Sequence, residues 1–433
     1  MISGAGLAFG LTRPSILVLL CVGVVMHLGI AIAQAASRMH EWDFSHYYVA
    51  AFAMRTGLNP YAMDLRPLGR QIGLEGIARA TDTPFFLLCF EPITWLGPAG
   101  AYWVWFAINA LSLALAMFLI LRVVARPNSH GHTTPELNRR ELISLCAIVL
   151  IYPPLSNHIF FAQTQILVLL LLVVAMRCLE GARDRTAGIV LAVATLLKVF
   201  PIVMVGYLIV RRRWRALEWM GIGLVAGVAT TAFAFGLERI ESFVGVNYFT
   251  RSPGFLARPA NVALGSFVSR MFWYANGDVT MHPWLDWTRT ITMLAVEMLL
   301  LGLTILATLP RLDMRQAKSR AVDRESRKYA LWVVTAIMLS PTAWIHYMTL
   351  LILPIMLVAA AGWSGSASSR ALWLIAASYA VISLSMAIAG SAQDSLAQRP
   401  YLKTALEECA TLSLLLAYAS VWYFAVDDPV EVE

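Results

Sequence analysis

The chain has 433 residues, of which 59% are apolar and only 14% are charged, whereas soluble domains are about 45–50% apolar and about 25% charged. Several apolar runs approach the roughly 20 residues that a helix needs to cross a bilayer, so the composition predicts an all-α polytopic membrane protein. The net charge of +7 does not indicate nucleic-acid binding, because the basic residues concentrate in short connections, where they set membrane topology. The five cysteines lack paired spacing and predict neither a disulfide framework nor a zinc site.

The first apolar segment, residues 14–36, exceeds the apolar core of about 7–15 residues in a cleaved signal peptide, so we expect an uncleaved anchor. The connection that follows contains Asp43 and Tyr47, which are four residues apart and would share one face of a helix. Asn59-Pro60-Tyr61 would end that helix, because proline disfavours helical geometry in the residue before it. A polar, aromatic segment of this kind beside a bilayer indicates a functional site.

Connections rich in lysine and arginine mark the cytoplasmic side of a membrane protein. This rule places the N-terminus and the acidic C-terminal end inside, and it places the two long, charge-balanced connections, 37–83 and 238–287, on the outer face of the cytoplasmic membrane. We therefore expect one integral-membrane domain over residues 1–433 with about twelve crossings. The expected crossings are 14–36, 99–122, 141–155, 163–179, 186–199, 201–212, 214–237, 288–310, 329–343, 346–363, 370–390 and 404–425.

Several of these crossings are too short to span a hydrocarbon core of roughly 30 Å. Prolines at positions 153–154, 201 and 341 interrupt them, and residues 83–96, which contain two further prolines, are expected to form a re-entrant hairpin. Broken backbone at membrane depth is tolerated where it is buried in protein or lines a wet cavity. Because all the breaks fall on the outer side of this topology, they predict a polar cavity in the outer leaflet.

Asp43 allows two interpretations. It can cap the helix that follows it, or it can serve as a general base beside the other polar groups of the outer face. Glu41, two residues earlier, would allow a weak carboxylate pair for a divalent cation, but we expect neither a metal nor a cofactor.

Lys198 lies in a strongly apolar stretch just before the break at Pro201. Its ammonium either snorkels to the headgroup level or binds a lipid phosphate as a point charge. His346 follows the break at Ser340-Pro341 and can donate to a phosphate or a sugar at neutral pH, while Trp344 also suits an aromatic belt at the membrane interface.

Four further polar residues lie at the outer ends of two crossings, where they would either bond between helices or bind a sugar. They are Asn157, His158, Gln163 and Gln165. The sequence contains no P-loop, no G-x-G-x-x-G fingerprint and no nucleophile elbow, and it has no region large enough for a soluble nucleotide-sugar domain. A glycosyl donor would therefore be a lipid.

The ordered set of motifs resembles glycosyltransferase family 87, the polyprenol-phosphate-mannose-dependent α-mannosyltransferases of the integral-membrane GT-C class. The features that carry the resemblance are Asp43-Phe44 with Tyr47, Asn59-Pro60-Tyr61, Gln163 after an aromatic pair, Leu197-Lys198 with Pro201, and Ser340-Pro341 with Trp344 and His346. The resemblance implies a multi-helix enzyme with an outward-facing site, inversion at the sugar carbon, and a catalytic aspartate in the first outer loop. Asp43 occupies that position.

Two elements depart from the family pattern. Its usual Gly-Gln-x-Asn reads Ala162-Gln163-Thr164-Gln165 here, and an Asn-Gln-Ser-like element in the second outer loop is reduced to Asn261-Val262-Ala263-Leu264. We expect both elements to contribute to sugar or acceptor binding. The resemblance therefore specifies lipid-phosphate-sugar chemistry more firmly than it specifies mannose.

We predict a membrane enzyme that moves one hexose, mannose by the resemblance, from a polyprenyl phosphate to a hydroxyl of a lipid- or glycan-linked acceptor. Asp43 would be the base, and Lys198 and His346 would stabilise the leaving phosphate. The residues expected to bind substrate are Tyr47, Asn59, Tyr61, Asn157, His158, Gln163, Gln165 and Trp344.

Two other classes of protein stay open at this point. A transporter or flippase also uses broken helices around a polar cavity, although it needs a path to the cytoplasm as well. A polysaccharide polymerase or ligase with a lipid-diphosphate donor would need more cations in the outer loops. Residues that supply them are Arg55, Arg66, Arg70, Arg251 and Arg258.

Overall fold

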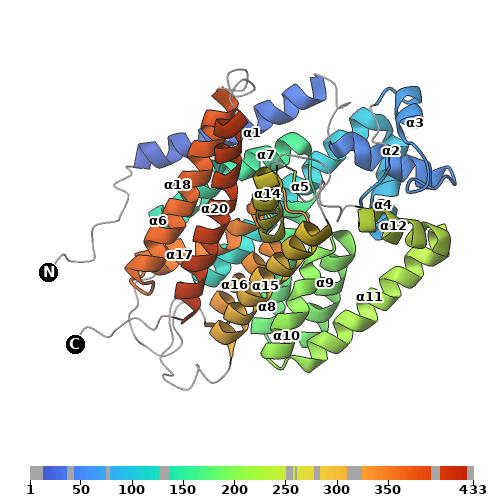
Figure 1. The fold of residues 1–433 in the computed structure, drawn as a ribbon. Helices are drawn as coiled ribbons and strands as arrows, with labels where there is room; N and C mark the ends of the chain where they lie inside the picture. The colour runs from blue at the N-terminus through green and yellow to red at the C-terminus, as the bar shows by residue number, and fades with distance from the viewer. Residues whose placement is uncertain are drawn as a thin grey trace.

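The computed structural model describes residues 13–36, 43–74, 79–125, 137–249, 257–258, 261–276, 283–309, 324–391 and 400–426. In these ranges every regular element is a helix, so the predicted all-α fold is confirmed (Figure 1). The helices up to the end of α12 are α1 (Arg13–Ala36), α2 (Asp43–Arg55), α3 (Arg66–Gln71), α4 (Pro84–Phe90), η1 (Glu91–Leu96), α5 (Gly97–Val124), α6 (Arg139–Leu150), α7 (Pro153–Phe161), α8 (Gln165–Glu180), α9 (Asp184–Leu197), η2 (Phe200–Val203), α10 (Met204–Val210), α11 (Trp214–Phe235) and α12 (Leu237–Phe249). Those that follow are α14 (Leu264–Asn276), α15 (Pro283–Thr308), α16 (Arg324–Met338), η4 (Ile345–Leu351), α17 (Ile352–Trp363), α18 (Ser369–Ser391) and α20 (Pro400–Val426).

The described helices confirm a multi-pass membrane protein. Six of them are long and apolar enough to cross a bilayer, and the number rises to seven if the bent pair α6 and α7 forms one span. The expected number of about twelve crossings therefore stays a prediction. Several of the remaining expected crossings, such as 201–212, correspond to helices too short to count as spans by themselves.

Three helix breaks lie where the prolines predict them. α6 and α7 meet at an angle of 50°, with Pro153 as the first residue of α7. α9 ends at Leu197, the backbone of Lys198 is extended, and a 3₁₀ turn with Pro201 near its start leads into α10. α16 ends before Ser340-Pro341, and the 3₁₀ helix η4 follows. Proline is tolerated at these positions because the first N–H groups of a helix have no partner within it.

Residues 83–96 differ from the expected re-entrant hairpin. Thr83 caps α4 by accepting a hydrogen bond from the amide of Phe86 at 3.1 Å. α4 and η1 then lead into α5, and together they form one helical run of 41 residues, Pro84–Val124. Gly97, whose φ of +69° falls in the left-handed region that favours glycine, marks the junction with α5.

Two apolar cores support the candidate site. The larger core is built mainly from α8, α16 and α17, and every residue of α16 from Ser326 to Met338 is buried. The smaller core is aromatic and joins α2, α4 and α5. Within it, the Tyr47 ring meets the rings of Phe86 and Trp105 edge to face, with centroids 4.9 and 6.4 Å apart. This packing fixes α2, which lies with α3, α4 and α12 at one side of the molecule in Figure 1.

Candidate active site

Asp43 and Tyr47 meet at one side chain, Gln163. The Tyr47 hydroxyl donates to Gln163 Oε1 at 2.7 Å, and Gln163 Nε2 donates to Asp43 Oδ2. The expected shared helix face is therefore confirmed, because a single amide bonds to both residues. The other carboxylate oxygen of Asp43 lies 3.4 Å from His46 Nδ1, and its side chain keeps 33% exposure. Asp43 is the first residue of α2, yet its carboxylate also bonds to Gln163 outside this helix, so capping alone does not account for its contacts.

Gln163 is placed by a tight turn between α7 and α8. Ala162 closes α7 in the left-handed conformation, with φ of +51°, and the Gln163 amide donates to the carbonyl of His158. Trp105 fastens the turn by donating its indole N–H to the carbonyl of Ala162 at 2.7 Å. A glycine, as in the family pattern, would adopt this conformation without the cost of roughly 1–2 kcal/mol that other residues incur.

Lys198 forms a buried ion pair with Asp82. Its Nζ lies 3.2 Å from Asp82 Oδ1, and the two side chains are 16% and 8% exposed. The same Nζ lies 5.8 Å from the centroid of the Tyr47 ring. The ammonium is thus directed inward, against the aromatic core, and whether it lies at the level of the lipid phosphates stays a prediction.

The segment after α16 brings His346 and Tyr347 to the same region. His346 is 5% exposed, and its ring centroid lies 6.1 Å from that of Phe161 and 5.4 Å from that of Tyr347. His346 and Tyr347 both lie within electrostatic range of Lys198. Gln165, fully buried at the start of α8, lies next to Tyr347.

Backbone and side-chain hydrogen bonds from Asn261 and Val262 to Ala343, called the latch below, hold this segment in place. The side-chain carbonyl of Asn261 accepts from the amide of Ala343 at 2.9 Å, and the amide of Val262 donates to the carbonyl of Ala343 at 2.6 Å. Asn261 and Trp344 also form an isolated β-bridge. The reduced element Asn261–Leu264 therefore has a structural role, since it holds the turn that precedes His346.

Other predicted substrate-binding residues lie apart from the Asp43–Gln163 contact. Asn59 donates to Glu238 Oε1 at 3.2 Å and to Ser242 Oγ at 3.0 Å, and so ties the first loop to α12. Tyr61 is buried, with its hydroxyl on the carbonyl of Asp82. Asn157 lies half-buried on α7. Their roles in substrate binding stay predictions, and Glu41 lies outside the described residues.

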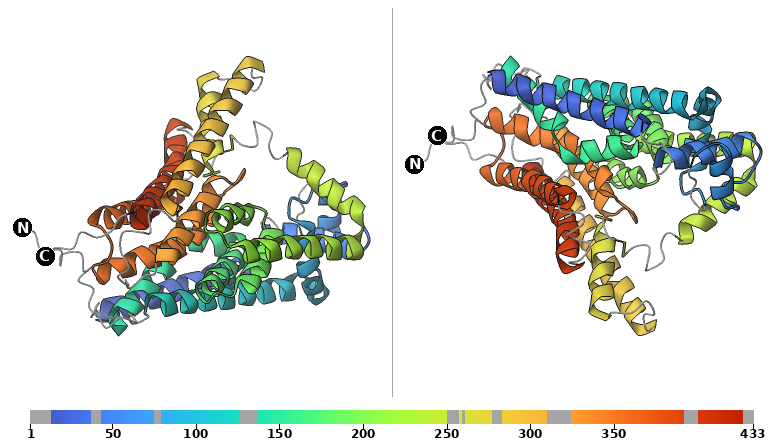
Figure 2. Two further views of the ribbon diagram at one scale, coloured as in Figure 1. Left: turned by 90° about the horizontal axis from the view of Figure 1, so that it is seen from below. Right: turned by 90° about the horizontal axis from the view of Figure 1, so that it is seen from above.

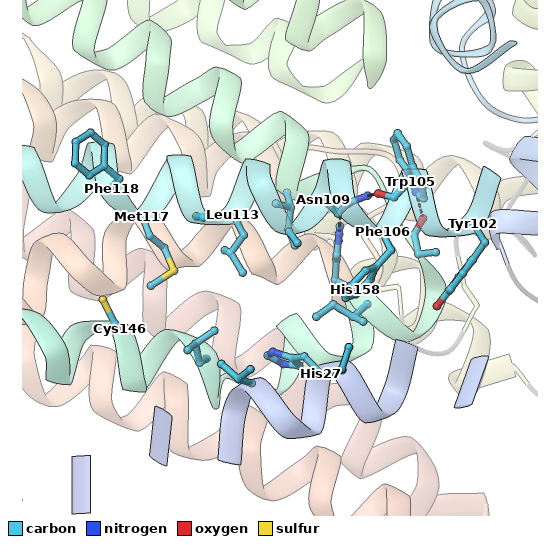
Figure 3. Close-up of a pocket in the computed structure, with 18 of the residues that line it drawn as sticks. His27, Tyr102, Trp105, Phe106, Asn109, Leu113, Met117, Phe118, Cys146 and His158 are labelled. Carbon is cyan, nitrogen blue, oxygen red and sulfur yellow. Dashed lines mark hydrogen bonds between the residues drawn. The ribbon is translucent and has the colours of Figure 1, made fainter. Parts of the chain in front are cut away.

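His158 faces a separate apolar cavity of about 560 Å³ between α1, α5, α6 and α7 (Figure 3). Its Nε2 lies 3.1 Å from Asn109 Oδ1, while its buried Nδ1 has no hydrogen-bond partner. Apolar side chains of α5, such as Leu113 and Met117, line one wall of the cavity, and His27 of α1 lies on the opposite wall (Figure 3). α1 runs beside α5 at this place (Figure 2, right). Trp105 and Ala162 separate the cavity from Gln163, because both line it and also bond across the turn.

Two residues with prominent positions were not among the predicted site residues. Asp82 appears in the sequence as one of several polar residues of the first loop, and nothing in its spacing connects it with Lys198, 116 positions later. In the sequence, Tyr347 is explained equally well as part of an aromatic belt at the membrane interface. Only the arrangement of α4, α9 and η4 places both beside Lys198.

The arrangement offers an accessible carboxylate and a fixed cation joined through Gln163 and Tyr47. Such a pair can accept a proton at one end and bind an anion at the other. Among the described residues, no group of three or more His, Cys, Asp and Glu side chains is placed to hold a metal ion. The expectation of metal independence stays a prediction.

Comparison with solved structures finds similar chains of low identity. The crystal structure of ArnT from Cupriavidus metallidurans bound to undecaprenyl phosphate is 14% identical, with a TM-score of 0.41, and the match covers 94% of this chain and 76% of that one. The apo structure of the same protein is 12% identical, with a TM-score of 0.38, and covers 95% and 76%. A comparison with curated proteins finds no match.

The family comparison is more specific. The model of glycosyltransferase family 87 matches residues 81–341, which are more than half of the chain. This segment contains Asp82, Gln163 and Lys198, whereas Asp43 precedes it. The resemblance seen in the sequence motifs is thereby confirmed, and this multi-pass membrane protein belongs to glycosyltransferase family 87.

Proposed function

We propose that this glycosyltransferase moves one hexose from a polyprenyl phosphate to an acceptor hydroxyl at the outer face of the cytoplasmic membrane, with inversion at the anomeric carbon. The observation that carries the proposal is the chain of contacts from Asp43 through Gln163 and Tyr47 to Lys198. It joins a group that can accept a proton to a group that can bind a phosphate.

In the proposed reaction, the acceptor oxygen attacks the anomeric carbon while the bond from that carbon to the phosphate oxygen breaks. Asp43 takes the acceptor proton, and the bonding electrons leave with the phosphate. Asp43 suits this role because its side chain is 33% exposed, whereas Asp82 is 8% exposed and engaged with Lys198. Gln163 holds the carboxylate in one orientation, which favours a productive approach of the hydroxyl.

Lys198 is the proposed ligand of the leaving phosphate. Charge develops on the phosphate oxygens as the glycosidic bond breaks, and a cation already fixed in a poorly solvated site stabilises that charge most effectively. His346, which lies within electrostatic range of Lys198, is proposed to act on the same anion. The sugar would then lie between Lys198 and Asp43, with mannose as the proposed hexose.

The apolar cavity beside the site supports a lipid-linked substrate. Its far side is formed by α1 and α5, whose neighbouring residues Val24, Leu28 and Phe118 are 53%, 47% and 50% exposed and suit a lipid environment. Trp105 and Ala162 form the wall between this cavity and Gln163. The hydrocarbon chain of the proposed donor, which begins at the phosphate, would pack against these apolar side chains.

The contacts of two loop arginines, Arg66 and Arg55, favour a monophosphate donor over a diphosphate. Arg66 pairs with Asp64 at 2.7 Å, with both side chains exposed. Arg55 stacks over the rings of Phe52 and Trp95, at 4.7 and 4.4 Å from their centroids. Both cations are engaged away from Lys198, and Arg251 lies outside the described residues.

The test is transfer by the purified protein in nanodiscs, supplied with radiolabelled polyprenyl-phosphate mannose and a lipid extract as acceptor. We expect a labelled product that requires the protein. Parallel reactions with the glucose-linked donor report the sugar preference. If neither donor yields product with any extract while both bind, the proposed reaction is refuted.

A further inference from the structure

Asp82 has no role in the reaction described above, yet its buried carboxylate forms an ion pair with the proposed phosphate ligand. Lys198 Nζ lies 3.2 Å from Asp82 Oδ1, and the Asp82 side chain is 8% exposed. Burying two charges costs free energy unless their geometry is well fixed, so a buried ion pair contributes little net stability. We therefore looked for a role of this pair in substrate binding.

Hydrogen bonds to Asp82 and to the adjacent Thr83 hold this part of the backbone in place. The Tyr61 hydroxyl donates to the carbonyl of Asp82 at 2.7 Å. The Thr83 hydroxyl donates to the carbonyl of Leu196 at 2.5 Å and also caps α4. These bonds fasten the residues at the start of α4 to the last turn of α9, so the carboxylate has a fixed position relative to the backbone of Lys198.

Lys198, in contrast, has a long and flexible side chain. A lysine carries roughly 2 kcal/mol of rotamer entropy, and its ammonium has three N–H donors. Asp82 accepts one of these donors, and the face of the Tyr47 ring lies on a further side at 5.8 Å. The fixed anion therefore selects one position of the ammonium and leaves N–H groups for a second anion.

We propose that Asp82 is a positioning residue that holds the Lys198 ammonium in place for the donor phosphate. The inference rests on the proposed function, in which Lys198 binds that phosphate. If Asp82 instead competed with the phosphate for the Lys198 ammonium, it would weaken phosphate binding, because a carboxylate repels a nearby phosphate. The effect of removing the charge of Asp82 thus distinguishes positioning from competition.

The experiment measures binding of undecaprenyl phosphate to the full chain in nanodiscs, together with KM and kcat for the donor. The variants are Lys198→Ala, Asp82→Asn and the double variant. We expect Asp82→Asn to lower kcat/KM for the donor by roughly 100-fold, the effect of a misplaced group, and to leave KM for the acceptor unchanged. In the Lys198→Ala background, Asp82→Asn should have no further effect, because its action requires the ammonium.

Each outcome has a defined meaning. If Lys198→Ala leaves undecaprenyl phosphate binding unchanged, the proposed phosphate site fails irrespective of Asp82. If Lys198→Ala weakens binding while Asp82→Asn strengthens it or leaves it unchanged, positioning is refuted. Effects that add in the double variant refute it too. Should Asp82→Asn fold poorly, Asp82→Glu, which retains the charge, is expected to recover donor binding in part, and a failure to do so counts against the inference.

Discussion

Replacement of Asp43 by asparagine tests the proposed base with little structural disturbance. Asparagine keeps the size of the side chain and an oxygen that can accept from Gln163 Nε2. It removes the charge and the ability to accept a proton. Because the side chain is 33% exposed, we expect a change in folding free energy of about 0.5 kcal/mol or less.

The catalytic effect should be far larger. A positioned general base contributes about 100- to 10,000-fold to the rate, which corresponds to roughly 2.7–5.4 kcal/mol of transition-state stabilisation. We expect kcat to fall by this factor and the KM for the donor to change little, because Asp43 faces the acceptor hydroxyl and not the phosphate in the proposed reaction.

The assay is transfer of labelled hexose in nanodiscs, with thermal unfolding of the same preparation as the measure of folding. Asp64→Asn is the matched control, since it removes a carboxylate of the same loop. The hydrogen bond from Arg66 lowers the pKa of the Asp64 carboxyl to about 2, so this control also removes a full charge at neutral pH. Near-normal turnover by Asp43→Asn, or an equal loss in Asp64→Asn, would refute the reasoning.

Three further predictions concern other parts of the site. Gln163→Ala should lower kcat by about 10- to 100-fold while KM for the donor stays within about twofold, because the carboxylate loses its orienting bond; a change in donor KM alone would contradict this. Asn261→Ala should destabilise the protein by about 1–3 kcal/mol, since a buried amide loses its acceptor, and an unchanged unfolding midpoint would count against the latch. Ala114→Trp places an indole in the apolar cavity and should raise KM for a long-chain donor more than for a farnesyl-phosphate donor. Leu115→Trp, on the same helix but outside the lining of the cavity, should affect neither KM.

The sequence determined the class of the molecule and the positions of its breaks. Composition and the long apolar runs predict an all-helical membrane protein, because the chain is more apolar and less charged than ordinary soluble domains and its runs approach the length of a membrane-spanning helix. The prolines at positions 153–154, 201 and 341 locate three interruptions, since a missing N–H and a fixed φ act locally and require no tertiary context. The pairing of Asp43 with Tyr47 on one face is likewise a local property of helical spacing.

The tertiary structure decided which polar residues meet. Gln163 bonds to Asp43 and Tyr47 across separations of 120 and 116 positions, and no pattern in the sequence specifies such a contact. The same holds for Asp82 and Lys198, whose pairing depends on how α4 packs against the end of α9. The contacts of Asn59 with α12 and of Tyr61 with the backbone of Asp82 likewise depend on packing, and the roles of both residues in substrate binding stay predictions. Local signals specify helices and their ends, whereas contacts between distant side chains depend on the packing of the whole bundle.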